Sequence, residues 1–360
     1  MYEASHVIAL RLDIDETGGG GHFQRCMALA GSLPCEEVLL LFRADEEFFD
    51  QQSTVFSSLR IPRELPLEAE AAFLAKERPG LALEAIFLDI SNARSYSQLA
   101  VLPTYSSSMT KLCPNSVLID GVPPDAILSR LPDPEVKFVL TPYVGAKRQS
   151  GAFTHLCGPD YFILPKRKVS VNSGKRAIAA SARKILVTMG RSDPAEATIQ
   201  VLGKVLEPFV ARHPDLPLSV VVGDLFSEDH KRKLRTLGSN YKAYLALLEQ
   251  QAYLSPLFEQ TDFAITSSGF TKYELAFTGT PCAFVAMDPA MKGINEEFSK
   301  AGSGMSLGQV DALDSSQLVG TILMILQGQE KRIQMSQAGS LLIDGQGTSR
   351  LVNATLGAKA

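Results

Sequence analysis

His22 is the side chain of this sequence best placed for acid–base chemistry, because it directly follows four consecutive glycines, Gly18 to Gly21. An amphipathic segment comes next, so the stretch predicts a glycine loop that ends at the start of a helix. The helix dipole disfavours an imidazolium there, and a neutral imidazole accepts a proton. Asp13 or Asp15, just after the preceding apolar run, could hold the other ring nitrogen. The alternative is a histidine that only caps the helix beside an ordinary turn.

The glycine loop also predicts an anion-binding site. Glycine lets a ligand approach the backbone closely, and the first N–H groups of a helix point toward a phosphate. A dinucleotide fingerprint is excluded, because its third small residue falls on Phe23 or Gln24. A Walker loop is excluded because no Gly-Lys-Ser/Thr follows. The triplet Asp13-Ile14-Asp15 has the D-x-D form that binds Mn²⁺ in some sugar transferases. Such triplets are common, and we expect neither a metal nor another cofactor.

A second strand–loop–helix pattern spans residues 184–198. Its loop contains Gly190, Arg191 and Ser192, and Arg191 is long enough to reach a phosphate. Asp193 has the position of an N-cap, with Pro194 in the first turn and Glu196 as the partner in a capping box. That capping role explains Asp193 completely and leaves residues 190–192 as the ligand-binding candidates.

A third pattern runs from Phe263 to Val285. A strand leads into Ser267-Ser268-Gly269, and the helix that follows carries Thr271 and Glu274. Small hydroxyl residues and glycine at a helix start predict a second anion pocket. If Glu274 faces the ligand, its carboxylate can accept both hydroxyls of a ribose. The alternative is a solvent-exposed glutamate opposite the apolar face of the helix.

The elements that position these motifs are short, continuously apolar runs separated by helical patterns. Such runs are typical of parallel strands buried on both faces, so the sequence predicts α/β units with parallel sheets. In such sheets ligands bind beyond the carboxyl ends of the strands. We expect helices at 23–33, 195–211 and 273–278, and strands at 7–12, 37–42, 85–90, 116–121, 137–143, 160–165, 184–190, 218–223, 262–269 and 281–287.

Length and composition set the organisation and the class of protein. The chain has 360 residues, 45% of them hydrophobic, which is enough for two cores. The net charge of −4 is a poor match to nucleic acid. The five cysteines form no C-x-x-C pair and predict free thiols. No signal peptide or membrane span is evident, so we expect a soluble cytoplasmic protein. The predicted boundaries are an N-terminal domain 1–164, a polar linker 165–183, a C-terminal domain 184–345 and a last helix 346–360.

The three patterns, in this order, resemble the PseG/SpsG-like sugar-nucleotide hydrolases of pseudaminic acid biosynthesis, which are related to the MurG glycosyltransferase. The stretch LRLDIDETGGGGHFQRCMALAGSL is similar to that family's Arg-x-Asp…Gly-x-Gly-His-x-x-Arg-Cys signature. The segments ILVTMGRSD, CGPDYFIL and SSGFTKYELAFTGTP resemble further family motifs. The resemblance covers most of the chain, and its N-terminal motif is the most specific part.

The resemblance implies a GT-B fold, in which two Rossmann-like, doubly wound parallel-sheet domains face a cleft and the last helix returns to the first domain. It implies that UDP binds the C-terminal domain, with Glu274 on the ribose. It also implies that His22 activates a water that displaces UDP with inversion, releasing 2,4-diacetamido-2,4,6-trideoxy-L-altrose. The candidate residues are His22 and Asp13 for catalysis; Arg11, Gly20, Gly21, Arg25, Asp89 and Tyr161 for the substrate; and Gly190, Arg191, Ser192, Ser267, Ser268, Gly269, Thr271 and Glu274 for the nucleotide.

Two departures from the family pattern leave the identity of the sugar open. Arg191 stands where the family has glycine, and Ala290-Met291 stands where the family usually has Asn-Gln, with Asn295 nearby. Two other functions stay open: an inverting glycosyltransferase in which His22 deprotonates an acceptor hydroxyl, and a non-catalytic protein that binds a nucleotide sugar. The exact sugar, any acceptor, the oligomeric state and the glycan served are not determined by the sequence.

Overall fold

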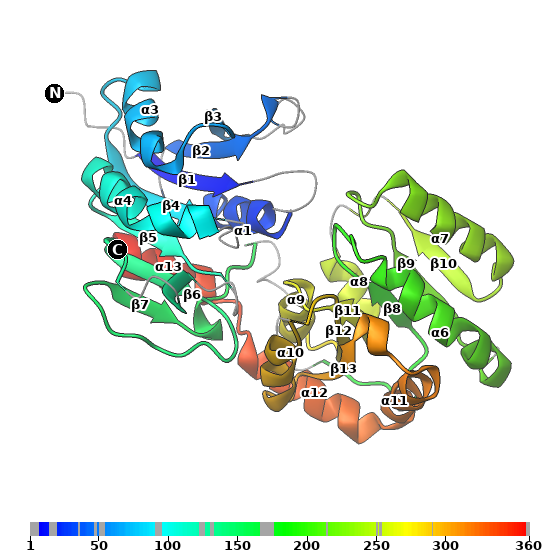
Figure 1. Cartoon of the computed structure of the whole chain (residues 1–360). Helices are drawn as coiled ribbons and strands as arrows, with labels where there is room; N and C mark the ends of the chain where they lie inside the picture. Colours follow the sequence, from blue (N-terminus) through cyan, green and yellow to red (C-terminus); the bar gives the residue numbers. More distant parts are fainter. Residues whose placement is uncertain are drawn as a thin grey trace. The chain divides into compact units, whose positions relative to one another are not determined.

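The computed structural model of the chain consists of two compact α/β units. Unit 1 comprises Met1–Val169 and Gln346–Ala360, and unit 2 comprises Ser170–Gly345. In each unit a parallel sheet is flanked by helices, which confirms the predicted fold class (Figure 1). The residues that the structure describes are 7–13, 20–34, 37–46, 49, 55–90, 96–121, 127–129, 133–165, 176–213, 215–249, 251, 254–289 and 291–357.

Unit 1 contains a seven-stranded sheet in the order β3-β2-β1-β4-β5-β6-β7, with every neighbouring pair parallel. The strand order reverses between β1 and β4, and this switch point is where doubly wound sheets bind ligands. The strands are β1 Val7–Asp13, β2 Glu37–Ala44, β3 Ser57–Pro62, β4 Leu83–Asp89, β5 Ser116–Ile119, β6 Phe138–Thr141 and β7 Thr154–Cys157.

The core of unit 1 lies on both faces of this sheet. Ile8 and Leu10 of β1 pack in one cluster of buried side chains, whereas Val7 and Ala9 pack in another. Alternate residues of a strand point to opposite faces, so burial on both faces explains the unbroken apolar run. The helical elements of unit 1 are α1 Gly20–Ala30, η1 Leu67–Ala69, α3 Glu70–Glu77, α4 Tyr96–Leu112, η2 Ile127–Ser129, η3 Pro159–Tyr161 and α13 Gly347–Leu356.

The C-terminal helix α13 is part of unit 1, although unit 2 separates it from the rest in sequence. Its Leu351 and Val352 are buried in the same cluster as Ile8 and Leu10 of β1. The Asn115 amide donates to the carbonyl of Thr355 at 3.0 Å and satisfies one carbonyl of the last turn. The last helix therefore completes the core of unit 1.

The strand predicted at 160–165 is wrong. Pro159–Tyr161 form a turn of 3₁₀-helix, and the edge strand β7 lies before it at Thr154–Cys157. The apolar residues after the turn are buried against α13 instead of a strand: the amide of Leu164 donates to Thr348 Oγ1 at 3.2 Å. These apolar residues are buried, as in a predicted strand, but they pack against a helix and not against neighbouring strands.

Unit 2 contains a six-stranded sheet in the order β10-β9-β8-β11-β12-β13, again with parallel pairs. Its switch point lies between β8 and β11. The strands are β8 Ile185–Thr188, β9 Leu218–Val221, β10 Leu245–Leu248, β11 Phe263–Ser267, β12 Cys282–Ala286 and β13 Gly304–Gln309.

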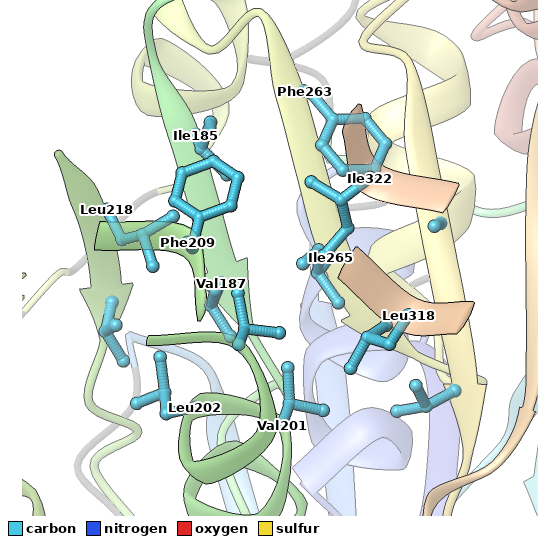
Figure 2. Close-up of a cluster of buried hydrophobic side chains, with 14 of the residues drawn as sticks. Ile185, Val187, Val201, Leu202, Phe209, Leu218, Phe263, Ile265, Leu318 and Ile322 are labelled. Carbon is cyan, nitrogen blue, oxygen red and sulfur yellow. The ribbon is translucent and has the colours of Figure 1, made fainter. Parts of the chain in front are cut away.

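Helices α6 and α11 cover one face of the unit 2 sheet. Figure 2 shows Val201, Leu202 and Phe209 of α6 against Val187 of β8, with α11 side chains completing the cluster near β11. The helical elements of unit 2 are α6 Ala197–Arg212, α7 Glu228–Asn240, α8 Ser255–Gln260, α9 Thr271–Phe277, α10 Met291–Lys300, η4 Val310–Ala312, α11 Ser315–Gln327 and α12 Gln329–Leu342.

The described part of the predicted linker, residues 176–183, is fastened to unit 2. The Arg176 guanidinium donates to the carbonyl of Phe258 at 3.0 Å and to Thr280 Oγ1 at 2.7 Å, and it also contacts the carbonyls of Thr261 and Thr278. One side chain thus satisfies carbonyls at the ends of both α8 and α9. Arg176 thus ties this stretch to unit 2, while five of its eight residues are exposed: Ala177, Ala179, Ala180, Ser181 and Arg183.

Candidate functional site

His22 lies in the first turn of α1, and its ring is hydrogen-bonded to Asp89. Nδ1 of His22 is 2.6 Å from Oδ1 of Asp89, the last residue of β4. Because β1 leads into α1 and β4 is the neighbour of β1 across the switch point, this pair lies where the fold favours a ligand. The His22 side chain is 27% exposed, whereas that of Asp89 is fully buried.

Two further side chains of α1 hold Asp89 in place. The Arg25 guanidinium donates through Nε to Oδ2 at 2.9 Å and through Nη2 to Oδ1 at 2.5 Å, and Cys26 Sγ lies 3.5 Å from Oδ2. Arg25 also donates to the hydroxyl of Tyr143, just beyond β6. The Asp89 carboxylate is therefore fixed by a bidentate pair, the strongest geometry available to arginine.

The electrostatic environment keeps Asp89 ionised. Burial alone would raise the pKa of Asp89, but the Arg25 guanidinium and His22 outweigh burial and hold the pKa well below its usual range. An ionised carboxylate only accepts hydrogen bonds, so Nδ1 of His22 is the donor to Asp89. Arg25 Nη2 lies 3.1 Å from Nδ1 and donates to the same oxygen of Asp89. In the neutral imidazole, Nε2 is then the nitrogen that can accept a proton.

Asp13 does not hold His22, which corrects the sequence-based expectation. Its carboxylate lies 2.7 Å from Nη1 of Arg11 and 3.8 Å from Nε of Arg43. Both cations also bind Glu70, so the two carboxylates and two guanidinium groups form one compact network. Asp13 is drawn toward these cations, whereas Asp89, from the adjacent strand, reaches the histidine. Asp15, the other candidate, lies outside the described residues.

The side chains expected to bind the substrate differ in their accessibility. Arg11 is fully buried in the network with Glu70, and Arg25 is 5% exposed, so both act as internal supports. Gly20 and Gly21 begin α1, and Gly21 is exposed beside His22. Tyr161 is the last residue of η3 and is partly buried against the core of unit 1. Gly18 and Gly19 lie outside the described residues.

In unit 2 the two predicted loops follow the two strands at the switch point. Gly190 to Ser192 follow β8, and Ser268 and Gly269 follow β11. Ser267 Oγ donates to the carbonyl of Met189 at 3.2 Å and ties the ends of these strands together. Gly190 has a φ of 96°, a backbone conformation that favours glycine. The loops predicted to bind the nucleotide are therefore neighbours.

The remaining nucleotide candidates lie at the same edge of the sheet. The Arg191 guanidinium is bidentate on Asp224, with Nε 3.0 Å from Oδ1 and 3.1 Å from Oδ2. Asp224 comes just after β9. A charged residue directly after a strand was the sequence signal that could have identified it as a site residue. Thr271 is buried, and Glu274 is the half-exposed residue of α9 among otherwise buried residues. Both the ribose-binding role and the solvent-exposed alternative for Glu274 agree with this accessibility.

Asp193 satisfies the start of α6 with its carboxylate, but the N-cap position is Glu196 and there is no capping box. Its carboxylate accepts the amides of Ala197 and Thr198, both at 2.8 Å. The helix begins at Ala197, so the prediction that Pro194 lies in its first turn is wrong. Glu196 has a left-handed φ of 48° and pairs with Lys233 of α7 at 2.7 Å. That conformation directs Glu196 away from the helix start.

Asn295 is not available to replace the family's Asn-Gln pair. It is fully buried on α10, and its Oδ1 accepts from Nζ of Lys272 at 3.1 Å. Met291 begins α10, and Ala290 lies outside the described residues. Within the described stretches, no group of three or more His, Cys, Asp or Glu residues is arranged to hold a metal ion. None of the helices described is long and apolar enough to cross a membrane.

Sequence comparisons with known proteins give distant relatives of this chain. No family model matches the chain. The chain is 25% identical, over 194 residues, to the spore coat polysaccharide biosynthesis protein SpsG of Bacillus subtilis; the match covers 54% of this chain and 56% of that protein. The chain spans little more than half the length of the curated relatives it matches.

Solved structures match over nearly the whole chain. MurG of Acinetobacter baumannii superposes with a TM-score of 0.65 at 12% identity, over 98% of this chain and 99% of that chain. The spinosyn rhamnosyltransferase SpnG superposes with a TM-score of 0.57 at 16% identity, over 97% of this chain and 99% of that one. With its two parallel-sheet α/β units, the chain has the fold of the GT-B glycosyltransferases. The name of SpsG assigns that protein to the biosynthesis of a spore coat polysaccharide.

Proposed function

We propose that the protein is a sugar-nucleotide enzyme that hydrolyses a UDP-sugar, with His22 as the general base. The observation that carries this proposal is the His22–Asp89 pair at the unit 1 switch point, in which Nδ1 contacts the carboxylate and Nε2 would be the proton acceptor of a neutral ring. The sequence similarity to SpsG and the shared fold with MurG support a sugar-nucleotide substrate. The family resemblance suggests a 2,4-diacetamido-2,4,6-trideoxy sugar.

In the proposed reaction, Nε2 of His22 takes a proton from water as the water oxygen bonds to the anomeric carbon. The bond between that carbon and the diphosphate oxygen breaks, and UDP leaves with the electron pair from the opposite face, which inverts the configuration. Asp89 stabilises the imidazolium that forms, and Arg25 keeps the carboxylate in position. The imidazolium then returns its proton to solvent.

Unit 2 supplies nucleotide binding in this proposal. Backbone N–H groups of the loop Ser267–Gly269 and the side chain of Thr271 would meet the diphosphate, and Glu274 would accept the ribose hydroxyls. Arg191 would leave the exposed carboxylate of Asp224 and bind a phosphate oxygen instead. Because both partners are anions, the positive charge of Arg191 stays paired. These contacts stabilise charge on the departing diphosphate.

An inverting glycosyltransferase is the second candidate, favoured by the structural match to a rhamnosyltransferase. In that case Nε2 of His22 deprotonates a hydroxyl of an acceptor molecule instead of water. The two functions differ in one measurable property: the hydrolase releases UDP and free sugar without any acceptor.

The first test measures UDP release from UDP-2,4-diacetamido-2,4,6-trideoxy-β-L-altropyranose without acceptor, followed by NMR. We expect free sugar to appear with inverted configuration. His22→Ala should reduce turnover by about 10²–10⁴-fold, the usual contribution of a general base, and leave UDP affinity within a few-fold. UDP binding without hydrolysis would favour the transferase, and unchanged turnover in His22→Ala would remove this residue from catalysis.

Two matched variants complete the test. His213→Ala removes a histidine at the end of α6 and should leave turnover unchanged. Glu274→Ala tests nucleotide binding, whereas His22→Ala tests catalysis. The loss of a charged hydrogen-bond partner should cost about 1.5–3 kcal/mol of the free energy of UDP binding, measured by calorimetry. Unchanged UDP affinity in Glu274→Ala would place the nucleotide elsewhere.

A further inference from the structure

Lys272 is a buried cation of unit 2 that the proposed mechanism does not use. It lies on α9 between Thr271 and Glu274, and none of its side chain is exposed. Lysine is rarely buried without a partner, because transfer of an ammonium group from water to a protein interior is costly. The groups around Nζ therefore decide whether this lysine carries a charge.

The ammonium group has one hydrogen-bond acceptor and an aromatic cage. Nζ donates to Oδ1 of Asn295 on α10 at 3.1 Å. Nζ also lies over three rings, at 5.8 Å from the centroid of Tyr273, 5.6 Å from Phe284 and 5.1 Å from Phe298. Ring faces attract cations, and the attraction strengthens when the cation is desolvated. No carboxylate among the described residues pairs with Lys272, so its charge has no counter-ion there.

The charge of this group is adjustable near neutral pH. Burial lowers the pKa of Lys272 to about 7, and the nearby Cys282 thiol of β12 opposes this slightly. Burial raises the pKa of Cys282 to about 12, so the thiol stays neutral. The other groups that face Nζ are uncharged: Asn295 and Phe298 from α10, and Phe284 from β12. A nearby anion would therefore shift the balance toward the protonated lysine.

The position of Lys272 connects it to the predicted diphosphate loop. Lys272 belongs to α9, which directly follows Ser267–Gly269, and it lies two residues before Glu274. Charges interact over several ångströms in a protein interior, where screening by water is weak. A protonated Lys272 would therefore attract an anion bound at this loop.

We propose that Lys272 is a buried counter-charge for the diphosphate, caged by aromatic rings and Asn295, which takes up a proton when the nucleotide binds. This inference rests on the proposed function, because it takes the Ser267–Gly269 loop as the diphosphate site. The linkage has a definite sign. UDP binding favours protonated Lys272, so UDP affinity falls as pH rises through neutrality, by at most tenfold per pH unit.

The experiment is titration of the full-length protein with UDP at pH 8, by calorimetry in two buffers of different ionisation enthalpy. The difference between buffers gives the number of protons taken up. We expect Lys272→Met to take up fewer protons than the wild type and to bind UDP about tenfold more weakly at pH 7. Titration of the UDP phosphate is common to both proteins and cancels in the comparison.

Two further variants make the result decisive. Asn295→Asp places a carboxylate against Nζ and holds the lysine protonated, so its extra proton uptake should also disappear, even if Lys272→Met does not fold. Lys300→Met removes an exposed lysine of α10, the helix that carries Asn295, and its proton uptake should match that of the wild type. Equal proton uptake in wild type, Lys272→Met and Asn295→Asp would overturn the role of Lys272 but not the nucleotide site. No UDP binding by the wild type would overturn the nucleotide site and this inference together.

Discussion

At the residue scale, the function of His22 depends on the charge of a buried neighbour. Asp89 fixes the ring through Nδ1, and Arg25 fixes Asp89 through two hydrogen bonds. The sequence placed His22, Arg25 and Asp89 in one site through their motif and the family resemblance. It assigned the partner of His22 to Asp13 or Asp15, because proximity along the chain could not show that Arg11 and Arg43 bind the carboxylate of Asp13.

Asp89→Asn should lower the free energy of unfolding at pH 7 by about 3–5 kcal/mol, because Arg25 loses its buried counter-charge. The pKa of Asp89 is held below its unfolded value, so its stabilisation is present above about pH 4 and is lost as pH falls further. Denaturant unfolding at pH 7 and pH 3 should show a large difference from wild type that shrinks in acid. Asp160→Asn, at an exposed aspartate of η3, is the control. A difference that does not depend on pH would mean that the substitution acts through the shape of the side chain and not through its charge.

At the element scale, the central strands could be predicted from sequence and the edge strands could not. The inner strands of both sheets are mostly apolar because helices cover both faces, as in β12 and the first four residues of β1. The four unpredicted strands β3, β7, β10 and β13 are the edges of the two sheets. Their residues are mostly exposed or half-buried. The sequences of β3, β7 and β13 lack an unbroken apolar run, whereas β10, with the sequence LALL, has one and was missed.

The start of α6 shows the same limit for helix caps. Residue type identified Asp193 as the cap, but its carboxylate reaches past a left-handed Glu196 to the amides of Ala197 and Thr198. Sequence spacing alone cannot reveal a backbone turn of that kind. Tyr143 and Lys272 were missed for a related reason, since only the packed structure shows what a buried tyrosine or lysine contacts.

Asp193→Ala should destabilise unit 2 by about 2 kcal/mol, at the upper end for a cap, because it leaves two buried amides without their acceptor. Thermal unfolding should show a lowered midpoint for the unit 2 transition. Asp311→Ala, at the exposed aspartate of η4, should leave that midpoint within error. An unchanged midpoint for Asp193→Ala would mean that water satisfies the start of α6 equally well.

At the scale of the whole molecule, the two units differ in how the chain builds them. Unit 2 is one continuous segment with its own core of α6, α11 and the sheet (Figure 2). Unit 1 is discontinuous and needs α13 from the end of the chain. Gly347 is packed so closely that a Cβ there would lie 2.6 Å from the amide nitrogen of Phe162. The packing of α13 against unit 1 is therefore specific, and the folding of unit 1 depends on this C-terminal helix.

Deletion of residues 346–360 should consequently unfold unit 1 and leave unit 2 intact. The deletion removes Leu351 and Val352 from the core and breaks the Thr348 contacts with Leu164. Loss of each large buried side chain costs about 2–5 kcal/mol, and two such losses equal much of the stability of a typical domain. Limited proteolysis with mass spectrometry should leave a protected fragment close to Ser170–Gly345. Cleavage spread evenly over both units would show that unit 2 also depends on α13, whereas protection of unit 1 would show that its sheet folds without the helix.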